Sequence, residues 1–210
     1  KYVATERDPA TAKRGQNPYH FIVRSTIFSH RNAWIIENNR LQKLGYNLFS
    51  FRNKMLIGYC RSGLLTAGAF YLSGVTGIIM FLLIATGGKV MLEGVNYMEH
   101  YGLIREKGAP IEPKHSWNTN KRISSIFLYN LTRHSSHHEN ASLEYWELKA
   151  YPHAPEMPLG YLSCVYLVLF VPWVYHRIMA PKLKEWDKNL ANNTERLLAQ
   201  KQNEASGLAY

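Results

Sequence analysis

Cysteine is scarce in this chain, which has only Cys60 and Cys164 among its 210 residues. The two cysteines lie far apart in apolar segments, and no CxxC pair occurs. This pattern excludes a disulfide framework and a cysteine-based zinc module, because both need several closely spaced cysteines. We therefore expect Cys60 and Cys164 to be buried free thiols.

Several catalytic signatures are also missing from the sequence. It contains no GxGxxG or Walker loop, no GxSxG turn and no HExxH pair. These are the usual motifs of dinucleotide-binding enzymes, P-loop NTPases, serine hydrolases and zinc peptidases. The chemistry of this chain must therefore be sought in another pattern of residues.

Acidic residues are few, because 15 Asp and Glu oppose 25 Lys and Arg and leave a formal net charge of +10. A basic balance of this size suits nucleic acid or an anionic membrane surface as a partner. Soluble nucleic-acid binding rests on this charge alone. The opening KYVATERDPATAKRG is polar, starts in mid-sequence and has no signal-peptide pattern, so we expect the chain to be part of a longer protein.

Long apolar runs are concentrated in residues 55–99, where two stretches meet near Ser73 and Gly74. Each stretch approaches the roughly 20 residues that cross a bilayer as a helix. The turn between them is uncharged, whereas basic residues flank the open ends: Arg52, Lys54, Lys89, Arg105 and Lys107. This distribution predicts a transmembrane hairpin with both ends in the cytoplasm. A buried helical pair in a soluble core is the alternative.

The composition of the whole chain predicts an all-α membrane helical bundle, in which residues 1–210 form a single partial domain. We expect a cytoplasmic segment at 1–54, the transmembrane hairpin at 55–99, a cytoplasmic histidine-box region at 100–158, an apolar re-entrant or interfacial helix at 159–179 and a polar tail at 180–210. A packed core helix is the alternative for 159–179. Within these parts, the pattern predicts helices at 19–44 and 121–140, the first ended by Gly45. The tail from Lys182 is typical of a charged, solvated helix and loop.

Three histidines are crowded into residues 130–140, which read NLTRHSSHHEN. On a helix, positions i, i+3 and i+4 share a face, so His134, His137 and His138 would lie on one stripe. That stripe continues backwards through Leu131, Asn130, Phe127, Ile126 and Ile123. Core-facing imidazoles cost desolvation unless each has a partner, and a shared iron, zinc or copper ion would satisfy all three. A surface cluster or hydrogen-bonded core histidines are the alternatives.

A fourth histidine lies in NYMEHYG, residues 96–102, where the second apolar stretch ends. Glu93, Asn96 or Tyr97, and His100 fall on one helical face, and ionisable groups near membrane depth are usually functional. His100 would reach the same level as the 134–138 helix. His115, in KHSWNTN, would either hydrogen-bond to a metal-ligating residue and orient it, or be a loop histidine without a role in the site.

The motifs NYMEHYGL, HSWN and LTRHSSHH, in this order and spacing, resemble the carboxyl half of the AlkB-type membrane alkane 1-monooxygenases and their relatives, the xylene monooxygenase hydroxylase subunits. The resemblance runs from KYVATERDPATAKRG to about residue 187. It implies an integral membrane non-haem di-iron enzyme that inserts one oxygen atom of O2 into the terminal C–H bond of an alkane. It also implies a multi-pass protein of the bacterial inner membrane with its active site on the cytoplasmic side.

The resemblance further implies the cofactors, the partners and the site residues. Two iron ions would be the cofactors and O2 the co-substrate, with a rubredoxin or ferredoxin-type electron donor, membrane lipid and an alkane as partners and no nucleic acid. The iron ligands on this chain would be His100, His134, His137 and His138. Separately from the resemblance, we expect Asn96, Glu99, His115 and Trp117 to orient these ligands. No catalytic residue is expected beyond this metal site.

The sequence also departs from the family pattern. The family's other two boxes, of the HExxxH and EHxxGHH types, do not occur in this chain, which is therefore expected to be inactive alone. Ser136 stands where many alkane hydroxylases have Asp in RHSDHH. A xylene-type methyl hydroxylase, a lipid desaturase or hydroxylase, and a non-catalytic membrane metal-binding protein are the alternative functions.

Overall fold

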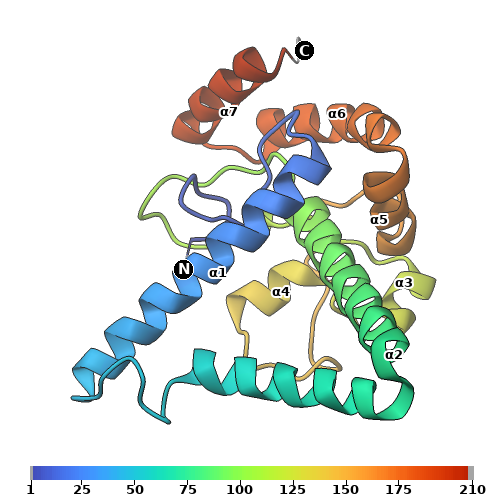
Figure 1. Cartoon of the computed structure of the whole chain (residues 1–210). Coiled ribbons are helices and arrows are strands. Elements are labelled where there is room, and N and C mark those ends of the chain that lie inside the picture. Colours follow the sequence, from blue (N-terminus) through green and yellow to red (C-terminus); the bar gives the residue numbers. More distant parts are fainter. Residues whose placement is uncertain (1, 208–210) are drawn as a thin grey trace. The chain divides into compact units, whose positions relative to one another are not determined.

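The computed structural model describes residues 2–207, which are predominantly helical. The elements are α1 (Pro18–Lys43), α2 (Lys54–His100), the short 3-10 helix η1 (Pro113–His115), α3 (Arg122–Phe127), α4 (His134–Glu139), α5 (Tyr161–Phe170), α6 (Pro172–Asn189) and α7 (Asn193–Ser206) (Figure 1). Within the described residues no strand forms, and Asn118 and Glu156 make an isolated bridge. The predicted all-α class is therefore confirmed.

The chain divides into two compact units. The first is Lys1–Arg24 with Glu93–Tyr210, and the second is Ser25–Leu92. Helices α1 and α2 each contribute residues to both units. All the residues predicted to form the metal site belong to the first unit.

In the second unit, local backbone signals set the end of α1 and the start of α2. Gly45 adopts a left-handed φ of +74°, and the Tyr46 N–H donates to the Leu41 carbonyl at 3.0 Å, which closes α1 as predicted. The Asn53 side chain accepts a hydrogen bond of 2.8 Å from the Met55 N–H. This contact caps the amino end of α2, where the backbone N–H groups have no helical partner.

Helix α2 bends where the two apolar stretches were predicted to meet. Ser73 and Gly74 leave the helical conformation, and Gly74 has φ +59° (Figure 1). Among residues 2–207, α2 is the one helix long and apolar enough to cross a membrane, with a most apolar window of mean hydropathy 2.0 and none of that window buried. The apolar faces of α2 are thus uncovered among the described residues, which favours the hairpin over a buried helical pair. The transmembrane hairpin itself stays a prediction.

The core of the first unit is built from aromatic and long aliphatic side chains. Its largest fully buried members are Trp117, Trp186, Tyr97, Tyr101, Tyr161, Tyr175, Phe21, Met98, Leu103, Met179 and Leu183. The apolar segment predicted as a single helix at 159–179 is divided at Val171, and α6 leaves α5 in a new direction (Figure 1). Pro172 explains the break, because proline has no N–H to continue α5 and suits the first turn of the next helix.

The single helix predicted at 121–140 is wrong. Tyr129 and Asn130 have positive φ values of 47° and 57°, and they separate α3 from α4. The apolar stripe proposed to lead into the histidines is also wrong, since Ile123 is 69% exposed and Ile126 is 64% exposed. Only the local spacing inside α4 remains from that prediction.

The tail predicted to be solvated is partly buried. Leu183 and Trp186 of α6 lie in the core, and Glu195 and Ala199 of α7 are each 1% exposed. The sequence pattern could not reveal this, because the groups that cover Glu195 come from a segment about eighty residues earlier in the chain.

The two cysteines are unpaired, as predicted. Cys164 is buried in α5, whereas Cys60 is exposed on α2, so the prediction that both are buried is half wrong. Cys60 lies on the same helix that presents an uncovered apolar surface.

Gly102 ends α2 in a conformation and a space that suit only glycine. Its φ is +68°, and a Cβ placed there would lie 2.7 Å from Leu183 Cδ2 and 2.9 Å from Arg14 Cγ. Arg14 itself donates from Nε to the Gly102 carbonyl at 2.9 Å and forms a salt bridge of 2.6 Å with Asp187. The final G of EHYG therefore lets α6 and the amino-terminal segment approach the end of α2.

Gly102→Ala should destabilise the protein by at least about 2 kcal/mol. A left-handed φ costs an L-residue roughly 1–2 kcal/mol, and overpacking a tight site adds about 1–3 kcal/mol. Gly45→Ala is the matched control, because Gly45 also has positive φ but no atom lies within 4 Å of a Cβ there. Denaturant unfolding in mild detergent measures both. An equal loss in the two variants would contradict the close packing at Gly102.

Candidate metal centre

The carboxyl end of α2 places His100 in the interior of the first unit. Trp117 fixes this end twice, since its backbone N–H donates to the Glu99 carbonyl at 2.8 Å and its Nε1 donates to the Tyr101 carbonyl at 2.8 Å. These two acceptors are among the carbonyl groups that a helix end leaves without a partner. His100 is consequently held between two anchored neighbours and is 4% exposed.

Helix α4 is only six residues long and depends on contacts outside itself. Its start is held by Asn118, whose Oδ1 accepts from the Ser135 N–H at 2.9 Å and whose Nδ2 donates to Ser135 Oγ at 2.7 Å. Ser135 Oγ in turn donates to the Pro113 carbonyl at 2.6 Å. Because a single isolated turn is unstable in water, these side-chain contacts fix the direction in which α4 points its histidines.

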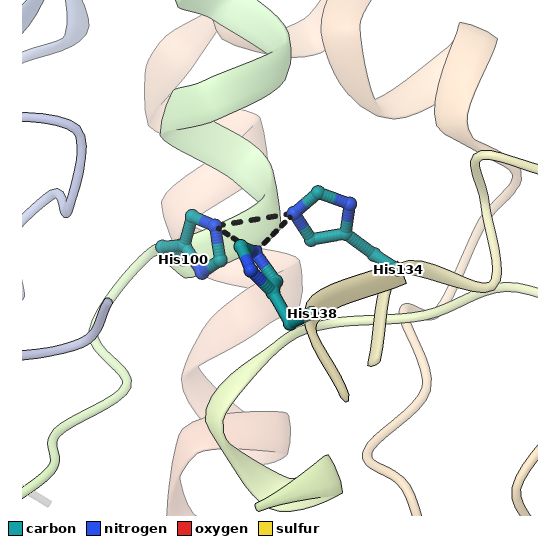
Figure 2. A group of neighbouring side chains, drawn as sticks. All are labelled: His100, His134 and His138. Carbon is teal, nitrogen blue, oxygen red and sulfur yellow. Dashed lines mark hydrogen bonds between the residues drawn. The ribbon is translucent and has the colours of Figure 1, made fainter. Parts of the chain in front are cut away.

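Three imidazoles from α2 and α4 converge on one point. The Nε2 atom of His100 lies 3.2 Å from that of His134 and 3.2 Å from that of His138, and the last two are 2.8 Å apart (Figure 2). His100 and His134 are buried, and His138 is half-buried. We call these three residues the histidine triad.

The hydrogen bonding of His100 leaves its Nε2 lone pair free to face the other two rings. Its Nδ1 lies 3.4 Å from the His115 carbonyl, which can only accept, so Nδ1 carries the proton. A ligating histidine usually donates its second ring nitrogen in this way to a backbone carbonyl or carboxylate. The tautomer of His100 is thus the one that a metal ion needs.

The spacing of the triad fits a single metal ion. Imidazole nitrogens bind metal at roughly 2.0–2.1 Å, which puts neighbouring ligand atoms about 3 Å apart. Hydrogen bonds among the three rings cannot satisfy all three Nε2 atoms together. His100 Nε2 has only a lone pair, and an N–H on His134 or His138 can be donated well to only one of the other two atoms. An ion at the centre would satisfy all three, and an all-imidazole donor set suits iron, zinc or copper.

Burial keeps the two α4 members of the triad neutral. It lowers the pKa of His134 well below its ordinary value, and the neighbouring His100, His138 and His137 lower it further. Burial, with His100 and His137, lowers the pKa of His138 to about 3. Neutral imidazole is the form that binds metal, so these ligands need not release a proton first.

Glu99 adds a carboxylate beside the triad. It is 2% exposed, its Oε2 lies 3.3 Å from His134 Nε2, and its Oε1 has no hydrogen-bond partner within the described residues. The Nδ1 atom of His134 is likewise buried and unpartnered there. Unpartnered buried polar atoms are costly, and a cation at the triad would compensate part of that cost. The site therefore fits a metal ion on observations independent of the spacing.

The remaining predicted residues lie at different distances from the triad. His137 is half-buried, and its ring centroid is 5.8 Å from those of His134 and His138, so it stands beside the group rather than in it. His115 and Trp117 contact the end of α2 through the hydrogen bonds described above. Asn96 lies one turn before His100 and donates to Glu93 Oε2 at 3.4 Å. The role of His137 as a ligand stays a prediction.

Sequence reasoning missed Asn118 and Ser135, whose pairing positions α4, and Glu195, whose carboxylate contacts His115. Asn118 lies in KHSWNTN and Ser135 in RHSSHH, so both occupy motifs that the sequence analysis had singled out. Their pairing joins segments separated by 17 residues, and only the fold reveals it. Glu195 lies in the tail and gave no signal beyond its capping pattern, NNTE.

The chain is similar to a fatty acid desaturase family model and to a set of monooxygenases. A family model described as fatty acid desaturase matches residues 1–181. Alkane 1-monooxygenase 1 of Pseudomonas aeruginosa is 35% identical over 88% of this chain and 50% of its own length. Alkane 1-monooxygenase of Pseudomonas putida is 34% identical over 88% of the chain and 47% of its own length. The xylene/toluene monooxygenase hydroxylase component of Pseudomonas putida is 32% identical over 98% of this chain and 56% of its own length. The chain thus spans about half the length of the curated relatives it matches.

Lowering the pH from 7 to 5 should destabilise the metal-free protein through the triad. Unfolded imidazoles take up protons near pH 6.5, whereas folded His138 does so only near pH 3. Below pH 6.5 the unfolded state binds more protons than the folded state, so the free energy of unfolding falls as the pH falls. Thermal unfolding after chelation, followed by tryptophan fluorescence at pH 7, 6 and 5, measures this dependence.

His138→Gln should show a shallower dependence on pH, because it removes one of the contributing imidazoles. His153→Gln is the control, since His153 is exposed and outside the triad. An unchanged slope in His138→Gln would show that the triad does not hold its members neutral.

Proposed function

Because the chain belongs to the fatty acid desaturase family, we propose that its histidine triad binds iron in an O2-dependent hydroxylase that converts alkanes to primary alcohols. The observation that carries the proposal is the convergence of three Nε2 atoms from α2 and α4, two of them on buried residues, within 3.2 Å of one another. The alkane 1-monooxygenases among the relatives supply the reaction and the substrate class.

Each residue of the site has a distinct part in this proposal. Iron held at this site would supply the activation of O2 that attack on an unactivated C–H bond requires. His100, His134 and His138 hold the ion through Nε2, and the His115 carbonyl keeps His100 in the correct tautomer. The Glu99 side chain lies beside the triad and, once ionised, would balance part of the ion's charge. The buried rings of Tyr101, Trp117 and Tyr161 exclude water from this end of α2.

We further propose a second iron, as the resemblance to the alkane monooxygenases implies. His137 is the ligand that this chain would offer to it, because His137 projects from α4 next to the triad without joining it. The two histidine patterns that the family adds, HExxxH and EHxxGHH, do not occur in these 210 residues. The complete protein is therefore the species to test for activity.

The proposed location is the bacterial inner membrane, with the site on the cytoplasmic side. The uncovered apolar surface of α2 supports contact with lipid, and the triad lies at the carboxyl end of this helix. Arg52 and Lys54 precede the apolar region, and Arg105 and Lys107 follow it. Basic residues at both ends favour a cytoplasmic position for both.

A rubredoxin or ferredoxin-type protein is the proposed electron donor, because insertion of one oxygen atom from O2 consumes two electrons. Such carriers are often acidic, and the net charge of +10 would speed their encounter with this chain. Methyl hydroxylation of xylene is the second candidate reaction, favoured by the xylene/toluene relative that matches 98% of the chain. Lipid desaturation or hydroxylation and metal binding without turnover are the remaining alternatives.

Membranes containing the complete protein, iron, a rubredoxin and its reductase should convert octane or hexadecane to the 1-alcohol with one oxygen atom from 18O2. Mass spectrometry of the products distinguishes this outcome from xylene methyl hydroxylation and from desaturation of a fatty acyl chain. His134→Ala should lower turnover by more than the roughly 10–100-fold that loss of an outer-shell partner costs.

His153→Ala is the matched control for His134→Ala, because it removes an exposed histidine outside the triad. Metal analysis of both proteins completes the experiment. Isolation of the protein with zinc alone, and no O2 consumption with octane, hexadecane, xylene or a fatty acyl chain, would refute the proposal that the protein is an oxygenase. Unchanged turnover in His134→Ala would favour a site elsewhere.

A further inference from the structure

Glu195 on α7 is a buried carboxylate that contacts His115, the residue whose carbonyl lies against His100. It is 1% exposed, although it lies beyond the residues that the family model matches. Its Oε1 is 2.9 Å from His115 Nε2, and its Oε2 accepts from Lys114 Nζ at 2.9 Å and from the Asn192 N–H at 2.9 Å. A buried carboxylate with this many donors is fixed in one orientation.

The contact between Glu195 and His115 has a defined direction. The Glu112 backbone N–H donates to His115 Nδ1 at 2.9 Å, so Nδ1 carries no proton. The proton of the neutral ring must then be on Nε2, from which it is donated to Glu195 Oε1. Glu112 and Glu195 therefore hold opposite sides of the His115 ring, which is itself 1% exposed.

His115 continues this chain of contacts to the triad through its backbone. Its carbonyl accepts from His100 Nδ1, and the Trp117 N–H, two residues on, donates to the Glu99 carbonyl. His115 is the last residue of η1, so the ring held by Glu195 and the carbonyl that accepts from His100 belong to the same residue. The path from α7 to the triad is thus Glu195, His115, His100.

We propose that Glu195 is a positioning residue for the metal centre, which holds His115 so that its carbonyl keeps the Nε2 lone pair of His100 directed at the metal position. This inference rests on the metal centre of the proposed function, but it adds a residue from α7 that is remote in sequence. The capping box accounts for the contact of Oε2 with the Asn192 N–H, but not for the contact of Oε1 with His115. The second oxygen is what distinguishes positioning from capping.

Glu195→Gln should weaken metal binding by about tenfold, the lower end of the range for outer-shell partners. In a Gln side chain only the oxygen accepts hydrogen bonds, because the nitrogen is a donor. Either His115 or the Lys114 and Asn192 donors therefore lose their acceptor. The measurement is a titration of the chelated complete protein with cobalt(II), followed by its visible absorption. In a His115→Ala background the same substitution should have no further effect, because the path is already broken.

Asn192→Ala is the matched control. It removes the Asn192 Oδ1 contact with the Glu195 N–H, which caps α7, but it leaves the Glu195 contact with His115 in place. It should lower the melting temperature without changing cobalt affinity. The proposal is overturned if Glu195→Gln binds cobalt within about twofold of the unaltered protein, or if Asn192→Ala lowers the affinity equally.

A second measurement needs no metal and no activity. In 15N-histidine-labelled, metal-free protein, the ring-nitrogen shifts of His100 should report a protonated Nδ1 and a bare Nε2, and Glu195→Gln should convert this to a mixture of tautomers. Unchanged His100 shifts would overturn the proposal. Failure to hydroxylate alkanes would leave these readouts intact, so the failure of the proposed function and that of the positioning role are distinguishable.

Discussion

The carboxyl end of α2 is the point on which the first unit depends, because its free carbonyl groups are satisfied by donors from several other segments. Trp117 donates to the carbonyls of Glu99 and Tyr101, and Arg14 donates to the carbonyl of Gly102. The Tyr175 hydroxyl lies 3.4 Å from the Met98 carbonyl. A buried helix end without such partners would be unstable. The amino-terminal segment, the loop before α3, and α6 are thereby brought to the same place, and His100 lies in the middle of it.

The histidine triad lies at this end of α2, and its members too are held in place by hydrogen bonds between buried polar groups. Two of its members lie on α4, which is only six residues long, and His100 is the last residue of α2. Their positions are set by side-chain contacts such as Asn118 with Ser135 and by the carbonyl of His115. Buried polar networks of this kind specify one arrangement when every member is satisfied.

How far the sequence predicts the structure depends on the range of the interactions involved. The end of α1 at Gly45, the bend of α2 at Ser73 and Gly74, and the common face of His134 and His138 follow from local rules of the backbone. The break of the predicted 121–140 helix at Tyr129 and Asn130 does not, because two non-glycine residues adopt positive φ there only in the context of the fold. Burial of Glu195 depends on Lys114 and His115, some eighty residues away, which no periodicity in the tail reveals.

The distance along the chain between the members of the triad has a consequence for folding. His100 and His134 are 34 residues apart, and an ion bound to both would close that stretch into a loop. Closing a loop of this length removes conformational freedom from the unfolded chain, and the free energy of ion binding then contributes to folding. A chain with two unpaired cysteines would in this way obtain from a metal the reversible cross-link that a disulfide gives to secreted proteins.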